Sequence, residues 1–134
     1  MTTTLQNPFG LHTVTPYLVV HGVEALLGFA QEVFGAELRG EPKYRENDTV
    51  QHVEILIGDS VIMMGEPMGQ IPSLPASLYI YVDDCDAAYE RALRAGAASV
   101  LEPTVFPHGD RYGGVRDASG NIWWIATHVG ADAA

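Results

Sequence analysis

Short runs of alternating hydrophobic and polar residues mark the first half of the chain. From Val14 to Val20 the side chains alternate with the two-residue period of a β-strand. Residues 22–34 then place apolar side chains at helical spacing, and the pattern stops at Gly35, which is typical of a helix end. Further strands are predicted at Glu37–Arg39, Val50–Ile57 and Ser60–Met64, with a Gly58-Asp59 turn joining the last two.

The second half of the chain repeats the first. A shift of 62 positions aligns Tyr79 with Tyr17 and residues 77–82 with residues 15–20. The second copy predicts a helix at Cys85–Ala95 and strands at Ser77–Val82, Ser99–Glu102, Tyr112–Asp117 and Asn121–Thr127. Two copies of so long a unit are expected to share one core. The pattern therefore predicts an α+β fold of two tandem βαβββ modules.

We expect residues 1–134 to form a single domain, since no linker composition interrupts the chain. The first module spans about residues 14–65 and the second about residues 77–129. A connector at 66–76 contains Pro72 and Pro75, which disfavour a regular helix or a central strand. Residues 1–13 are expected to form an arm whose Phe9 and Leu11 are suited to dock onto a partner.

Alternation along the predicted strands separates two faces of the sheet. Val53, Ile55 and Ile57 form a purely aliphatic face that must pack on the helices, whereas the opposite face is mixed. By the same rule the residues on the opposite face of both modules are polar or aromatic: Tyr17, His52, Glu54, Tyr79, Tyr81 and a Trp. Such a surface is too polar for a core, and it predicts a ligand cup.

Composition narrows the classes of partner. Seven Lys and Arg face 17 Asp and Glu, so the formal charge of −10 repels nucleic-acid backbones and anionic membranes. A single cysteine cannot form an internal disulfide, and the N-terminus lacks the pattern of a secretory signal. No apolar stretch approaches the roughly 20 residues of a membrane helix. We expect a cytoplasmic protein that binds neither nucleic acid nor membrane.

Four motifs carry a resemblance to a known superfamily. They are Phe34-Gly35-Ala36-Glu37, Ile57-Gly58-Asp59-Ser60, the sequence GDRYG at 109–113, and the pattern D-x-x-GN-x-W-x-x-ATH at 117–128. In this order and spacing, residues 14–129 resemble the vicinal oxygen chelate superfamily, in particular its glyoxalase/bleomycin-resistance, PhnB-like branch. The resemblance implies two modules with curved mixed sheets that form a cup, often in a homodimer. We therefore expect a homodimer.

The resemblance also locates the four positions that hold a metal ion in enzymes of this superfamily. Those positions fall here on Thr15, Met63, Ser77 and Trp124, none of which suits a divalent cation. We therefore expect no metal and no cofactor. The methionine and the tryptophan instead give the cup an apolar, polarisable floor that suits an organic ring.

Individual residues leave several roles open. His52 and Glu54 lie two apart on one strand, so they are candidates for a general base or for a supporting hydrogen-bonded pair. Arg111 either holds a ligand carboxylate or pairs with Asp110 or Glu54 and shapes a loop. His108 is either a group at the rim of the cup or an exposed loop residue. Strand alternation sends Met63 toward the cup, although a core-filling role is an equal alternative.

Two functional classes follow from these residues. The first is metal-independent binding of an aromatic or apolar organic ligand, with Tyr17, Tyr79, Tyr81 and Trp124 as stacking surfaces. The second is a metal-free lyase, isomerase or cyclase in which Glu54 or His52 moves a proton. A metal enzyme with unusual ligands would have to use His52, Glu54 and His108. The sequence does not decide whether the protein is an enzyme.

Overall fold

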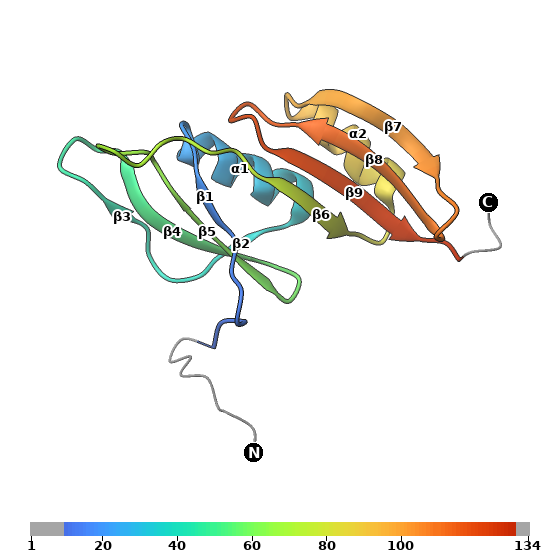
Figure 1. The fold of residues 1–134 in the computed structure, drawn as a ribbon, viewed down its shortest axis with the longest axis horizontal. Coiled ribbons are helices and arrows are strands. Elements are labelled where there is room, and N and C mark those ends of the chain that lie inside the picture. The colour runs from blue at the N-terminus through green and yellow to red at the C-terminus, as the bar shows by residue number, and fades with distance from the viewer. Residues whose placement is uncertain (1–9, 131–134) are drawn as a thin grey trace, which may run out of the picture.

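The computed structural model describes residues 10–130 and arranges them as two modules (Figure 1). Most of the expected N-terminal arm, including Phe9, lies outside this range. The first module contains β1 (Tyr17–Val19), α1 (Val23–Phe34), β2 (Glu37–Leu38), β3 (Lys43–Tyr44), β4 (Val50–Ile57) and β5 (Ser60–Gly65). The second contains β6 (Ser77–Tyr81), α2 (Cys85–Arg94), β7 (Ala98–Val105), β8 (Asp110–Arg116) and β9 (Ile122–His128).

Each module folds into its own mixed sheet with one helix behind it. The strand order is β1-β5-β4-β2 in the first sheet, where β3 also pairs with β4, and β6-β9-β8-β7 in the second. Figure 1 shows the two sheets side by side with both helices on the same side of them. The α+β class and the two-module architecture are therefore confirmed. In the part of the chain that the structure describes, no helix is long and apolar enough to cross a membrane.

The sequence repeat corresponds to an equivalent strand register in the two modules. β1 runs parallel to β5 with Tyr17 opposite Met63, and β6 runs parallel to β9 with Tyr79 opposite Trp124. The two tyrosines aligned by the repeat thus occupy the same place in their sheets, and so do Met63 and Trp124.

The core lies between the sheets and the helices, on the faces that strand alternation predicted. Leu18, Val53 and Ile55 are almost completely buried there. Trp123 packs against Phe34 of α1 with 4.9 Å between ring centroids, which ties the second sheet to the first helix. The helices also meet directly, because the Arg91 guanidinium of α2 donates to the Val33 carbonyl of α1 at 3.0 Å.

Three predicted strand boundaries are wrong by more than one residue. The strand predicted to begin at Val14 begins at Tyr17. The strand predicted to end at Glu102 continues to Val105, because the pairing of β7 with β8 shifts register between Leu101 and Thr104 and so accommodates Pro103. β8 begins at Asp110 rather than at Tyr112. The short strand β3 has no counterpart in the prediction, since two residues carry no detectable alternation.

Candidate functional site

Both sheets turn one face away from the helices, and these two faces carry the candidate site residues. We call them the first face, on β1, β4 and β5, and the second face, on β6, β8 and β9. The first face presents Tyr17, His52, Glu54 and Met63, with Met63 paired between Tyr17 and Glu54. The second face presents Ser77, Tyr79, Tyr81, Asp110, Tyr112 and Trp124.

A chain of hydrogen bonds crosses the first face. The Arg39 guanidinium donates to Glu54 Oε1 at 2.6 Å, and His52 Nε2 lies 2.8 Å from Glu54 Oε2. The hydrogen bond from His52, followed by that from Arg39, lowers the pKa of Glu54, which therefore remains a carboxylate and accepts both bonds. In the neutral imidazole, Nδ1 then accepts from the Tyr17 hydroxyl at 3.3 Å.

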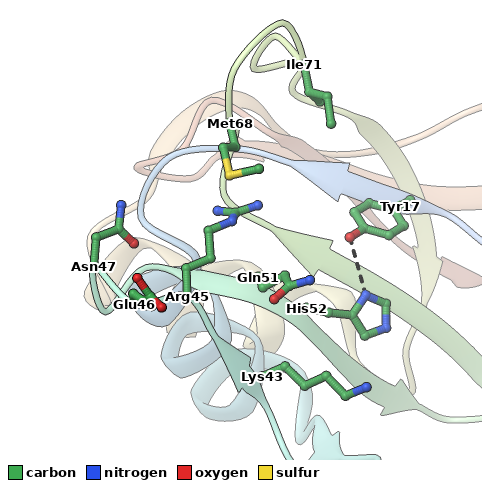
Figure 2. Close-up of a pocket in the computed structure, with 9 residues that line it drawn as sticks. All are labelled: Tyr17, Lys43, Arg45, Glu46, Asn47, Gln51, His52, Met68 and Ile71. Carbon is green, nitrogen blue, oxygen red and sulfur yellow. Dashed lines mark hydrogen bonds between the residues drawn. The ribbon is translucent and has the colours of Figure 1, made fainter.

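A pocket of about 810 Å³ opens on the first face (Figure 2). Tyr17 and His52 line it together with Lys43 and Arg45 from β3 and the loop that follows. Met68 and Ile71 contribute apolar surface from the connector, where they face each other in an isolated β-bridge. The expected connector thus forms part of a pocket wall.

One buried carboxylate organises the second face. Asp110 is only 1% exposed, and its Oδ2 accepts from the hydroxyls of Tyr79 at 2.6 Å and Tyr81 at 2.8 Å. His128 Nδ1 lies 2.8 Å from Oδ1, and His108 Nε2 lies 3.4 Å from Oδ2. The hydrogen bonds from Tyr79 and His128 hold the pKa of Asp110 well below its usual range. Desolvation and the bond to Asp110 raise the pKa of Tyr79, so its phenol remains a donor.

Aromatic rings cover the rest of the second face. Phe106 and Tyr112 stack with centroids 4.3 Å apart, and Tyr112 meets Tyr79 edge to face at 5.4 Å. Trp124 lies 6.1 Å from Tyr112, again edge to face. Tyr79 and Tyr81 remain 45% and 63% exposed although their hydroxyls are bonded. The rings are therefore fixed in orientation while their faces stay accessible.

The four positions of the superfamily's metal ligands are used differently in this chain. The Trp124 indole Nε1 donates to Ser77 Oγ at 2.8 Å, so these two positions bond to each other. Thr15 Oγ1 donates to the His12 carbonyl at 3.4 Å. Within residues 10–130 no group of three or more His, Cys, Asp or Glu side chains could hold a metal ion. The substitute set of His52, Glu54 and His108 is therefore wrong, because His108 lies beside Asp110 on the second module.

Arg111 does not lie on either face. It alternates with Asp110 and Tyr112 along β8, so its side chain points toward α2 and forms two bonds of 3.0 Å with Asp86. In this structure Arg111 pairs with Asp86, and neither with Asp110 nor with Glu54 as the pairing alternative expected. That Arg111 holds a ligand stays a prediction.

The D-x-x-GN-x-W motif has a structural role. The buried Asp117 carboxylate accepts from the Ser119 and Asn121 amides at 2.9 and 3.0 Å and from the Trp123 indole at 2.8 Å. These bonds close the turn before β9 and fix the core tryptophan. The motif thus sets the position of Trp124 one residue further on.

Sequence reasoning missed three residues of these surfaces: Asp110 as the centre of the second face, Tyr112 as its central ring, and Lys43 in the first-face pocket. Extending strand alternation two residues before Tyr112 would have placed Asp110 on the same face as Tyr112. No comparable signal precedes Lys43, because β3 has only two residues.

The duplicated module, the open sheets and the aromatic second face together define an α+β protein of the glyoxalase type. Residues 10–125 match the Glyoxalase/Bleomycin resistance protein/Dioxygenase superfamily, to which this chain belongs.

Similar proteins support this assignment at the level of fold. An uncharacterized protein of Mycobacterium bovis is 28% identical over 129 residues, which cover 87% of this chain and 83% of that protein. The crystal structure of TioX from Micromonospora sp. ML1 has a TM-score of 0.70 at 20% identity and covers 87% of this chain and 95% of its own. A PhnB protein from Bacillus cereus has a TM-score of 0.69 at 19% identity, covering 87% and 99%.

Proposed function

We propose that the protein binds an aromatic or otherwise apolar organic ligand, without a metal, on the second face. The observation that carries the proposal is the set of fixed but accessible rings around Asp110. Because hydrogen bonds already orient Tyr79, Tyr81 and Trp124, a flat ligand would not have to immobilise them on binding. Each aromatic contact would then contribute about 1 kcal/mol beyond its buried area.

Tryptophan fluorescence tests this proposal directly. Titration with 1-naphthol should change the emission of the half-buried Trp124, whereas Trp123 is 1% exposed and should respond little. Trp124→Ala should abolish most of the response, and calorimetry should show about fivefold weaker binding for one lost ring contact. Tyr44→Ala is the matched control, since Tyr44 is 52% exposed on β3 in the other module. Equal affinity in Trp124→Ala would contradict the proposal.

The hydrogen-bonded chain on the first face supports a second candidate, metal-free proton-transfer catalysis. Both Glu54 oxygens are engaged, and its lowered pKa keeps it ionised. The proton-accepting group of this candidate is therefore His52, with Glu54 as the residue that orients it. If a bound probe is converted, His52→Ala should slow turnover by about 10²–10⁴. Mass spectrometry that finds every probe intact after long incubation would favour sequestration over catalysis.

The expected homodimer and cytoplasmic location belong to the same proposal. Val14 and Leu74 are 81% and 72% exposed, which supports a covering partner. Light scattering should give twice the 14.5 kDa of one chain, and a mass of one chain at micromolar concentration would exclude the dimer. Cys85 is buried and unbridged, as a reducing compartment allows.

A further inference from the structure

Positive charge is scarce in this chain, and some of it is left uncompensated in the first-face pocket. Seven Lys and Arg face 17 Asp and Glu, and Lys43 is the only lysine. Two arginines outside the pocket form ion pairs, Arg39 with Glu54 and Arg111 with Asp86. The Lys43 ammonium makes no hydrogen bond or ion pair with any residue in the described range 10–130. It lines the pocket as a free donor.

Arg45 adds a second cation whose charge is not neutralised. Its guanidinium donates to the Glu66 carbonyl at 3.1 Å and to Thr49 Oγ1 at 3.3 Å. Both acceptors are uncharged, so they fix the guanidinium without cancelling its charge. Against Lys43 and Arg45 the pocket lining offers one carboxylate, Glu46. The local charge is therefore positive in a chain whose formal net charge is −10.

Gln51, the hydrogen-bonded pair of Tyr17 and His52, and two apolar side chains complete the pocket. Figure 2 shows Gln51 and His52 on β4 near Lys43, with the Tyr17 hydroxyl directed at His52. Met68 and Ile71 are 57% and 56% exposed on the connector wall. An apolar body lying against these two side chains would remove apolar surface from water, which favours binding.

We infer that the first-face pocket binds a small organic monoanion, a carboxylate with a short apolar chain, whose charged end meets Lys43 while Arg45 adds to the positive charge of the pocket. One excess positive charge matches one carboxylate. A multiply charged phosphate would meet the same two cations inside the field of a strongly acidic protein, which opposes its approach. This site is separate from the proposed aromatic site, because Trp124 does not line the pocket.

The single lysine permits a local test. Reductive methylation with ¹³C-formaldehyde labels only Lys43 and the α-amino group and keeps the positive charge. Titration with hexanoate should shift the Lys43 methyl resonance to saturation, and the neutral isostere hexanamide should not. Inorganic phosphate, which has charge but no apolar body, should also leave the resonance unmoved. An equal response to hexanamide or to phosphate, or no response to hexanoate, would overturn the inference.

Variants sharpen the result. Lys43 is exposed and unpaired, so Lys43→Gln should fold normally, and the Gln51 side-chain amide then reports binding by ¹⁵N NMR. Hexanoate affinity should fall about two- to fivefold, the range expected for one exposed charge pair. Arg94→Gln, in the last turn of α2, is the control and should leave the affinity unchanged. Unchanged affinity in Lys43→Gln would refute the assignment, whereas a failed naphthol titration would refute only the aromatic site.

Discussion

Gly114 offers a direct test of how Trp124 lies on the second face. A Cβ atom at this position would stand 2.6 Å from Cζ3 and 2.7 Å from Cε3 of Trp124, so Gly114→Ala must displace the indole. Overpacking of this kind costs about 1–3 kcal/mol. Movement of the ring also breaks its hydrogen bond to Ser77, which is worth about 1 kcal/mol. Alanine recovers up to about 1 kcal/mol because it is less flexible than glycine in the unfolded chain. We expect a net loss of about 1–3 kcal/mol.

Gly28 supplies the matched control. It lies in the middle of α1, and a Cβ atom there would meet nothing within 4 Å. Gly28→Ala should therefore stabilise the protein by about 1 kcal/mol through helix propensity. Urea unfolding of both variants should move the midpoint in opposite directions without a change in slope. The same chemical change thus tests the local geometry rather than the general effect of alanine.

A double-mutant cycle isolates the contact itself. In Trp124→Leu the large ring is absent, so adding Gly114→Ala should cost little, and the coupling energy should reach about 1–2 kcal/mol. Near-ultraviolet circular dichroism of Gly114→Ala should change as the indole leaves its position. If Gly114→Ala unfolds at the wild-type midpoint with an unchanged spectrum, Trp124 does not lie across β8 and is not part of the aromatic surface of the second face.

Four further substitutions, of which Tyr17→Phe is a control, test the hydrogen-bonded polar groups. The pKa of Asp110 is held below its ordinary value of about 3.9, so its ionised form stabilises the fold above about pH 4, and this contribution is lost as the pH falls further. Asp110→Asn should therefore lower the thermal midpoint at pH 7 and flatten the decline of that midpoint below pH 4. A decline in the variant parallel to that of the wild type would contradict this. Asp117→Ala should cost about 2–4 kcal/mol in urea unfolding, because buried amide and indole donors lose their acceptor; a loss under 1 kcal/mol would exclude the role given to the turn. Tyr79→Phe should lower the free energy of unfolding by about 1–2 kcal/mol, because it removes a hydrogen bond to a buried charge, whereas Tyr17→Phe should lower it by less than about 0.5 kcal/mol. Equal losses in the two variants would contradict the stabilising role given to the bond between Tyr79 and Asp110.

The hydrophobic pattern and the repeat were sufficient to predict the fold. Leu18, Val53 and Ile55 are buried as alternation requires. The register that places Tyr17 opposite Met63 and Tyr79 opposite Trp124 follows from the same shift of the sequence. These features depend on local periodicity and on cross-strand pairing, both of which a single sequence carries.

The candidate site was less predictable, because its geometry depends on which neighbour a side chain reaches. Arg111 had several acidic residues within plausible reach, and only the packing of α2 on β8 selects Asp86. Asp110 looked like one loop acid among 17 acidic residues, yet burial and three hydrogen bonds make it the centre of the second face. Partner choice of this kind is a property of the tertiary fold and leaves no periodic signal.

The two tyrosines aligned by the repeat have different hydrogen-bond partners. Both donate their hydroxyls to a group on a neighbouring strand, Tyr17 to an imidazole and Tyr79 to a carboxylate. A carboxylate raises the pKa of the phenol that it accepts from, so Tyr79 is fixed as a donor with an exposed ring. The imidazole that faces Tyr17 has its other ring nitrogen 2.8 Å from Glu54 Oε2. The same strand position thus carries a phenol bonded to an imidazole on the first face and a phenol bonded to a carboxylate on the second.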